Sequence, residues 1–341
     1  MARVLVRCCL TATVILGAAP ACGSDARLAR PRVEPVVNAD NQASARRFID
    51  SDWDTLARIG GKASDTTLLR PRLIAAGQGR LAAFDYGDYQ IKVFDGSGAM
   101  LWRFGQEGSG PGEFRGAFDI EIAQDTSVWL LDPRLNRITV VSRTGEFVDV
   151  LDPNSELLSS MVPRPDGVIA VTARLDPFWL YLDRNGMLLR QGAMPVSALA
   201  DVPAFARQPL VSSTPDVWAV VFPYGNLLIV YRGEHLHCTG TLIEGEGFPA
   251  APAPDLTFWA AAIAVRNNNA VVLAQGKSEH RLRALDFYAL DDCSYAHSLL
   301  LPRPASALAH AEGVFWIEYE DPAPALLGLR LKAGGSANDH R

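Results

Sequence analysis

The chain has 341 residues, of which 48% are hydrophobic and 21% are charged, a composition that is ordinary for a globular protein. Its formal net charge is −6, and no basic block follows the N-terminal segment, so binding of nucleic acid has little electrostatic support. The 28 glycines and 22 prolines favour many short strands joined by turns over long helices.

The N-terminus has the pattern of a targeting segment. Arg3 and Arg7 form a basic start, and residues 8–19 form an apolar stretch that is too short and too rich in alanine to be a good membrane span. The sequence therefore predicts a signal peptide over residues 1–21. No later segment is long and apolar enough to cross a bilayer.

The end of this leader reads Ala-Pro-Ala-Cys-Gly-Ser, in which the cysteine is Cys22. This resembles the lipobox of bacterial lipoproteins. The resemblance implies that Cys22 carries lipid and that the protein belongs to the cell envelope, lipid-anchored and facing the periplasm or exterior. Cleavage after Ala21 without lipidation stays open as an alternative, because Ala19 stands where the lipobox prefers leucine.

Residues 22–50 are rich in Arg, Ala, Pro, Asn and Asp without apolar periodicity, and we expect a flexible tether there. The first clear strand, residues 53–59, has no partner nearby in the sequence. We expect it to pair with the last strands of the chain and so to remove an exposed sheet edge. The small, polar tail over residues 333–341 is expected to be disordered.

Two stretches then repeat each other at an offset of 47 residues. Asp85 in the first corresponds to Asp132 in the second, and Gly98 corresponds to Gly145. A repeat of roughly 40–50 residues made of short strands is typical of a propeller blade. A single blade cannot bury its own faces, so several blades must stack around an axis.

The joint between the two repeats, residues 102–114, holds four glycines and one proline. Together with the Leu-Asp-Pro-Arg-Leu-Asn-Arg-Ile that ends at Ile138, it resembles the NHL repeat, which implies a β-propeller. The resemblance covers residues 70–150. It is close in the second repeat and partial in the first, where Tyr89 and Gln90 replace the Asn and Arg of the pattern.

Beyond this region the blades are visible only as apolar runs between turns. Counting the second strand of each blade predicts six blades. We expect one all-β domain over residues 51–332, a six-bladed β-propeller of four-stranded antiparallel blades that the N-terminal strand closes. The six second strands are expected at residues 81–84, 128–131, 168–172, 217–221, 270–274 and 314–319.

Cys238 and Cys293 each follow the third strand of a blade, and the two blades are neighbours. If Cys22 is lipidated, these two cysteines remain as an even pair in an oxidising compartment. A disulfide between them and two separate half-buried thiols are about equally compatible with the sequence.

The loops between second and third strands open on one face of a propeller and supply aromatic and charged side chains for recognition. For Asp85 and Asp132 the favoured interpretation is instead that each carboxylate caps its own turn. The ligand-binding candidates are Asp85, Tyr86, Asp88, Tyr89, Asp132, Arg134, Asn136, Arg174, Trp179, Tyr224 and Asn226.

Signals for catalysis and for a cofactor are weak. His235 and His237 are the only histidines close together, and no cluster of cysteine, histidine and aspartate accompanies them, so we predict no metal site. The NHL-type lyase holds its metal with histidines that this chain lacks at the matching turns. Calcium is possible if Asp85, Asp132, Asn136 and Asn226 imitate the channel of six-bladed lactonases.

These observations predict a cell-envelope lipoprotein whose propeller face binds a protein, peptide or carbohydrate, without catalytic residues. The alternative is a metal-dependent hydrolase or lyase, similar to a lactonase, with calcium or zinc in the channel.

Overall fold

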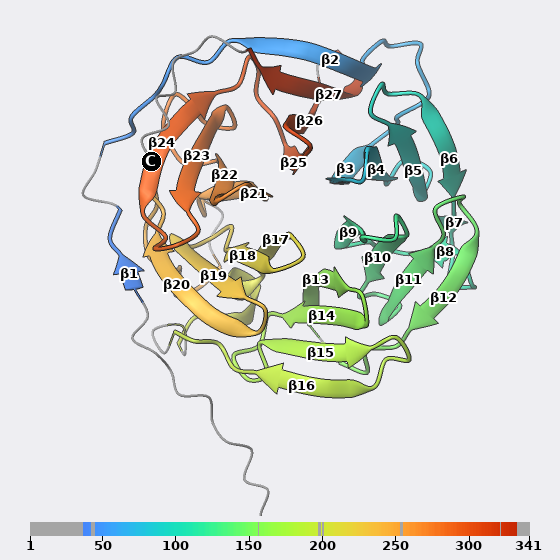
Figure 1. Cartoon of the computed structure of the whole chain (residues 1–341), viewed down its shortest axis with the longest axis horizontal. Helices are drawn as coiled ribbons and strands as arrows, with labels where there is room; N and C mark the ends of the chain where they lie inside the picture. Colours follow the sequence, from blue (N-terminus) through green and yellow to red (C-terminus); the bar gives the residue numbers. More distant parts are fainter. Residues whose placement is uncertain are drawn as a thin grey trace, which may run out of the picture. The chain divides into compact units, whose positions relative to one another are not determined.

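The computed structural model describes residues 37–41, 45–155, 157–196, 199, 201–252, 255–320 and 322–332. Within this part of the chain, six small sheets stand around a central axis and form a propeller (Figure 1). The predicted signal peptide, the lipidation of Cys22 and the predicted disordered tail lie outside the described residues. No helix of the described part is long and apolar enough to cross a membrane.

The first three blades follow the predicted strand order, with the first strand of each blade nearest the axis. Blade 1 holds β3 (Pro71–Gly77), β4 (Arg80–Asp85), β5 (Gln90–Asp95) and β6 (Met100–Phe104). Blade 2 holds β9 (Asp119–Ile122), β10 (Val128–Asp132), β11 (Arg137–Val141) and β12 (Phe147–Leu151). Blade 3 holds β13 (Leu158–Arg164), β14 (Gly167–Thr172), β15 (Trp179–Asp183) and β16 (Leu188–Gly192).

The other three blades complete the ring and confirm the predicted count of six. Blade 4 holds β17 (Leu210–Ser213), β18 (Val217–Val221), β19 (Leu227–Arg232) and β20 (His235–Thr241). Blade 5 holds β21 (Ala260–Arg266), β22 (Asn269–Ala274), β23 (Ala284–Ala289) and β24 (Tyr295–Leu300). Blade 6 holds β25 (Ala307–Ala311), β26 (Val314–Glu320), β27 (Pro324–Leu331) and, from the other end of the chain, β2 (Trp53–Gly60).

The closure of the ring by the N-terminal strand is confirmed. β2 pairs antiparallel with β27, with Trp53 opposite Leu331 and Gly60 opposite Ala325. Blade 6 therefore has four strands although the C-terminal part of the chain supplies three. The pairing covers the edge of β27, which would otherwise present free backbone groups to a neighbouring molecule.

The segment before β2 differs from the expected flexible tether. β1 (Val37–Ala39) adds a fifth strand to blade 4, parallel to β20, and Phe48 bridges to Ser298 on the outer strand of blade 5. Polar side chains explain why a segment without apolar periodicity is ordered. Asn41 is buried, donates to the carbonyls of Thr241 and Cys293, and accepts from the backbone N–H of Tyr295.

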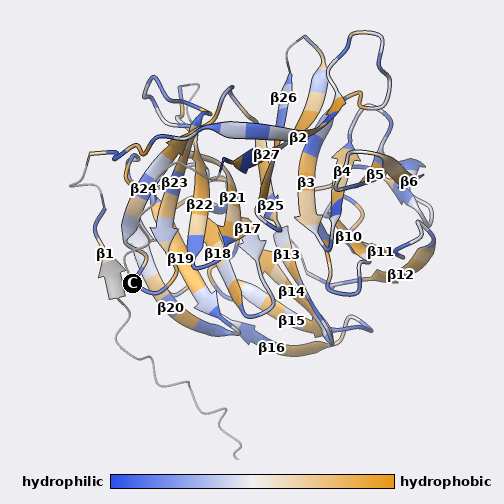
Figure 2. Cartoon of the chain, turned by 45° about the horizontal axis from the view of Figure 1, so that its top comes forward, coloured by the Kyte–Doolittle hydropathy of each residue, from blue (hydrophilic) through white to orange (hydrophobic). Residues whose placement is uncertain are grey.

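The hydrophobic core lies between neighbouring blades. The strands carry apolar residues on the faces that meet the next blade, seen as orange bands in Figure 2. Between blades 1 and 2, for example, Phe84, Phe114 and Leu130 are fully buried in one cluster. Each such side chain contributes roughly 1.5–3 kcal/mol on burial, so the interfaces between blades hold the ring together.

The glycine-rich joint between blades 1 and 2 folds into two short strands, β7 (Gln106–Glu107) and β8 (Glu113–Phe114), which pair in parallel. Gly105 has a φ of 104°, and a Cβ atom there would overlap the ring of Phe114. Glycine is therefore required at this point, because the positive φ and the close ring exclude other residues.

Candidate functional site

Asp85 and Asp132 each accept an N–H group from their own turn, as the favoured interpretation of the sequence has it, but they also hold the chain that enters the blade. The fully buried carboxylate of Asp85 accepts the backbone N–H groups of Leu69 and Arg70, both at 2.7 Å, and the ammonium of Lys92, also at 2.7 Å. Burial alone would raise the pKa of Asp85, but these donors hold it below its usual value. The carboxylate is thus fully used in fixing the backbone that enters blade 1.

Asp132 does the same one blade later. It accepts the backbone N–H groups of Arg115 at 2.7 Å and Gly116 at 3.1 Å, at the end of the glycine-rich joint, and that of Arg134 in its own turn. Thr172 replaces the aspartate in blade 3, accepting from the N–H of Arg174 and donating to the carbonyl of Pro177. The Asp of the repeat therefore maintains the fold and leaves no free carboxylate for a ligand.

Three of the predicted aromatic candidates pack internally. The Tyr86 hydroxyl donates to the carbonyl of Ala117. The rings of Tyr86 and Tyr89 pack edge to face and both contact Phe84. Trp179 is 7% exposed and packs in the core between blades 3 and 4. These rings stabilise the blades and offer little surface to a ligand.

The polar candidates are spread over separate turns. Asp88 lies 2.7 Å from the Lys92 ammonium, and Asn136 donates to the Asp152 carboxylate at 3.0 Å. A larger set is exposed or half-buried and is distributed over the turns of four different blades. This set comprises Asp88, Arg134, Asn136, Arg174 and Asn226.

Tyr224, by contrast, belongs to a cluster of half-exposed rings. Its ring centroid lies 4.5 Å from that of Phe258 and 5.7 Å from that of Phe205. Phe205 sits on the short 3-10 helix η2 (Ala204–Arg207), and Phe258 is 38% exposed. We call Phe205, Tyr224 and Phe258 the aromatic platform.

The two segments that supply Phe205 and Phe258 are the longest crossings between blades, residues 193–209 and 242–259. Long crossings are where propellers and other scaffolds carry binding residues, because the strands themselves are committed to packing. The sequence analysis included Tyr224 but missed Phe205 and Phe258. The signal was available, since both are aromatic residues in long segments rich in proline and alanine.

A pocket of about 300 Å³ adjoins the platform. Phe258 forms one wall, and Gln275, Lys277 and Arg281 line it from the turn between β22 and β23. The Lys277 ammonium lies 5.4 Å above the ring of Trp259 and 3.3 Å from the Glu246 carboxylate. An aromatic wall thus stands beside exposed cationic and amide groups.

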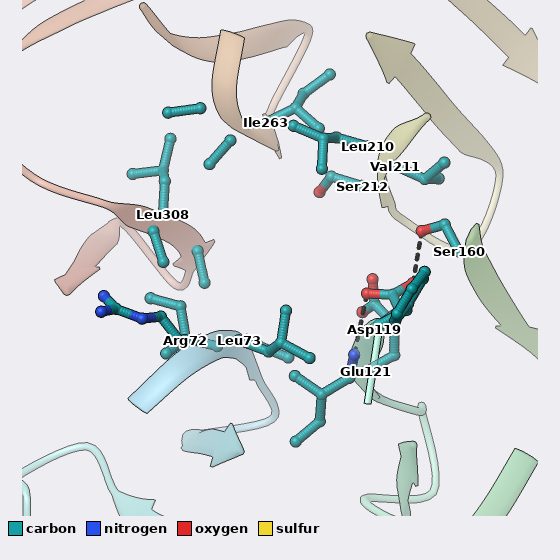
Figure 3. A pocket seen from close by; sticks show the side chains of 18 of the residues that line it. Arg72, Leu73, Asp119, Glu121, Ser160, Leu210, Val211, Ser212, Ile263 and Leu308 are labelled. Carbon is teal, nitrogen blue, oxygen red and sulfur yellow. Dashed lines mark hydrogen bonds between the residues drawn. The ribbon is translucent and has the colours of Figure 1, made fainter. Parts of the chain in front are cut away.

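A second concave region is the central channel, a cavity of about 140 Å³ lined by the innermost strand of every blade (Figure 3). Asp119 and Glu121 from β9 face this space, which aliphatic side chains and serine hydroxyls also line. The sequence analysis missed them. The signal was the spacing Asp-Ile-Glu, which puts two carboxylates on the same side of an innermost strand.

Metal binding gains no support from the described residues, since they contain no group of three or more His, Cys, Asp and Glu side chains arranged to hold an ion. Asp85 and Asp132 were two of the four proposed calcium ligands, and both are saturated by backbone donors. His235 and His237 both lie on β20.

Cys238 and Cys293 form the disulfide that was one of the two alternatives, with 5.9 Å between their Cα atoms. Both residues are fully buried, and the bond joins β20 of blade 4 to the turn before β24 of blade 5. Structural disulfides are typical of proteins outside the reducing cytosol, so this bond indicates an extracytoplasmic location.

Comparison with known proteins identifies no family model that matches the chain and no similar curated protein. Solved structures with the same fold include a putative exported protein of Bacteroides fragilis, at 10% identity and a TM-score of 0.56, covering 88% of this chain and 100% of the other. A member of the DUF4221 family from Bacteroides vulgatus is 9% identical with a TM-score of 0.53, and the match covers 85% of this chain and 100% of the other. A streptogramin B lyase is 12% identical with a TM-score of 0.51, and the match covers 82% of this chain and 98% of the other. At these identities the likeness shows the shared propeller fold.

Proposed function

We propose that this protein is a binding protein of the bacterial cell envelope, held at the membrane by a lipid on Cys22, and that the aromatic platform is its ligand-binding surface. The ligand is a protein, peptide or carbohydrate, bound without chemical change. The observation that carries the proposal is the gathering of Phe205, Tyr224 and Phe258 on the two longest crossings of the ring.

The chemistry of the platform supports this choice of ligand. Half-exposed rings bind apolar side chains and the faces of sugar rings, and aromatic residues are enriched among those that dominate binding energy. The adjoining pocket adds the donors of Gln275, Lys277 and Arg281 for polar groups of the ligand. A surface of this kind supports recognition, because a few polar groups beside an aromatic wall fix the orientation of a ligand.

The location in the envelope rests on two independent features. The disulfide between Cys238 and Cys293 supports an oxidising compartment. The lipobox-like Ala-Pro-Ala-Cys-Gly-Ser supports attachment through Cys22. Labelled fatty acid should be incorporated by the wild-type protein and lost in Cys22→Ser; equal incorporation by the variant would refute the anchor.

Ligand binding is tested with glycan and peptide arrays probed by the mature propeller, followed by titration of each hit. Tyr224→Ala should weaken the hit about tenfold or more, because truncation of a central aromatic residue commonly costs at least 1–2 kcal/mol. The matched control is Phe147→Ala, which removes an exposed ring on β12 of blade 2. Equal loss in both variants, or no loss in Tyr224→Ala, would contradict the proposal.

A further inference from the structure

The central channel holds a pair of carboxyl groups, Asp119 and Glu121, that differ in how the fold partners them. Asp119 accepts hydrogen bonds from the hydroxyl of Ser160 at 2.6 Å and from the backbone N–H of Met161 at 2.8 Å. Among the described residues, Glu121 has no hydrogen-bond donor and no ion-pair partner. The two side chains point to the same side of β9 and lie close together in Figure 3.

The surroundings make this arrangement costly. Burial raises the pKa of Asp119 to about 7, and burial together with the charge of Asp119 raises that of Glu121 well above its usual value. Carboxylates enclosed in a protein are normally paired with a cation or with several donors. Asp119 has donors that fix its position, whereas Glu121 faces the cavity unpartnered.

The other ionisable groups on the cavity wall do not supply the missing cation. Arg72 lies across the cavity from Asp119 in Figure 3, and its guanidinium is 3.8 Å from Glu318 and 3.7 Å from Glu320 in blade 6. His310 also lines the cavity, but burial lowers its pKa to about 4, so the imidazole is neutral near pH 7. Within the described part of the chain, neither Arg72 nor His310 therefore pairs with Glu121.

The remainder of the cavity wall is mixed, with apolar side chains beside the hydroxyls of Ser160 and Ser212. Leu73, Leu210, Ile263 and Leu308 stand around it in Figure 3. A volume of about 140 Å³ is close to that of the engineered cavity, roughly 150 Å³, that binds benzene, so the space suits a ligand of about six heavy atoms. These four aliphatic side chains and the two carboxylates match a short alkyl chain that ends in a cationic group.

We propose that the central channel is a binding site for a small protonated primary amine, with its ammonium on Glu121 and Asp119 and its alkyl chain against the aliphatic side chains. An ammonium donates three hydrogen bonds, and charge-assisted bonds to carboxylates are the strong ones. This site is separate from the aromatic platform and does not depend on the function proposed for it.

The test is calorimetric titration of the mature propeller with n-butylammonium at pH 7, with n-butanol as the uncharged analogue of the same size. We expect the amine to bind, n-butanol to bind at least about tenfold more weakly, and binding to release protons, because a bound cation lowers the pKa of the pair. Titration in two buffers of different ionisation enthalpy measures the protons released.

Glu121→Gln keeps the shape of the side chain and removes its charge. It should weaken n-butylammonium about tenfold or more, in line with hydrogen bonds to charged groups. The matched control, Glu107→Gln, changes an exposed carboxylate on β7 and should leave binding unchanged. Melting at pH 5 verifies that both variants are folded.

Three outcomes would overturn the proposal: equal affinity of the wild type and Glu121→Gln, equal affinity for n-butanol and n-butylammonium, or binding of calcium chloride where the amine does not bind. If Glu121→Gln does not fold, the wild type alone decides the matter, since an amine that binds without releasing protons does not contact the carboxylate pair.

Discussion

Blades 1 and 2 fix their incoming chain differently from blade 5. In the first pair an aspartate of the blade itself, Asp85 or Asp132, holds the backbone that enters the blade. At blade 5 the acceptor carboxylate lies in the crossing and the N–H donors lie in the blade. Glu244 in the crossing accepts the N–H groups of Lys277 and Ser278 in the turn of blade 5.

The later arrangement also draws on distant parts of the chain. Arg46, from the segment before β2, lies between Glu244 and Asp286 and donates to both. Burial would lower the pKa of Arg46, but these two carboxylates raise it above its usual value. The disulfide ties blades 4 and 5 together. The two longest crossings, which carry the aromatic platform, lead into blades 4 and 5.

The strongest test of this contrast is Asp85→Ala. It leaves three backbone N–H groups and the buried Lys92 ammonium without this carboxylate, and we expect the free energy of unfolding to fall by about 3–5 kcal/mol. Chemical denaturation measures the loss. Asp95→Ala, which removes a turn aspartate at the surface, should lower the free energy of unfolding much less than Asp85→Ala does. Similar losses in the two variants would mean that Asp85 does not hold the incoming chain.

Removal of the disulfide probes the later blades. Cys238→Ser combined with Cys293→Ser should lower the free energy of unfolding by about 2–4 kcal/mol, because the bond closes a loop with a sequence separation of 55. Thermal melting of oxidised, reduced and double-variant protein gives the comparison. A reduced protein as stable as the oxidised one would show that blades 4 and 5 do not need this link.

Arg46→Ala should lower the free energy of unfolding by about 2–3 kcal/mol. This is somewhat less than the loss expected when a fully buried ion pair is broken, because Glu244 keeps partial contact with water. The control is Arg232→Ala, whose ion pair with Asp291 is exposed and worth about 0–1 kcal/mol. Deleting residues 37–45 together with the preceding chain should also destabilise the propeller. Unchanged melting after both changes would return this segment to a simple tether.

The smallest expected effect concerns the carboxylate pair and depends on pH. The folded state raises the pKa of Asp119, to about 7, and that of Glu121, so their contribution to stability is complete below the unfolded pKa of about 4 and is lost as pH rises through the raised values. Glu121→Gln should therefore have a higher free energy of unfolding than the wild type at pH 8, by on the order of 1–2 kcal/mol. The gain should be smaller at pH 5, and melting at the two pH values measures it. A gain that does not change with pH would exclude titration of the pair as its cause.

The sequence predicted the fold well because a period of strands and turns needs no knowledge of side-chain direction. The six second strands and the closure by β2 follow from spacing, which also left a disulfide between Cys238 and Cys293 as one of two alternatives. The site was harder to predict. Asp85 and Tyr224 both lie at turns on the same face, and only the structure shows that one carboxylate is saturated by backbone donors while one ring meets Phe258.

Two further features lay beyond sequence patterns. Asn41 and Arg46 sit in a polar segment whose order comes from partners some 200 residues away, which no local periodicity reveals. Glu121 enters the channel only when the ring forms, and there the described residues offer its carboxyl group no hydrogen-bond donor. Such roles depend on which surfaces the fold brings together.

The pairing of β2 with β27 also sets an order of events during synthesis. β2 is synthesised early and its partner β27 is synthesised last, so blade 6 stays incomplete until the chain is nearly finished. Contacts between residues this far apart form late in folding because the intervening chain must be ordered first. A chain threaded through a translocation channel from its N-terminus therefore reaches its compact state only after release, and it needs protection from aggregation until then.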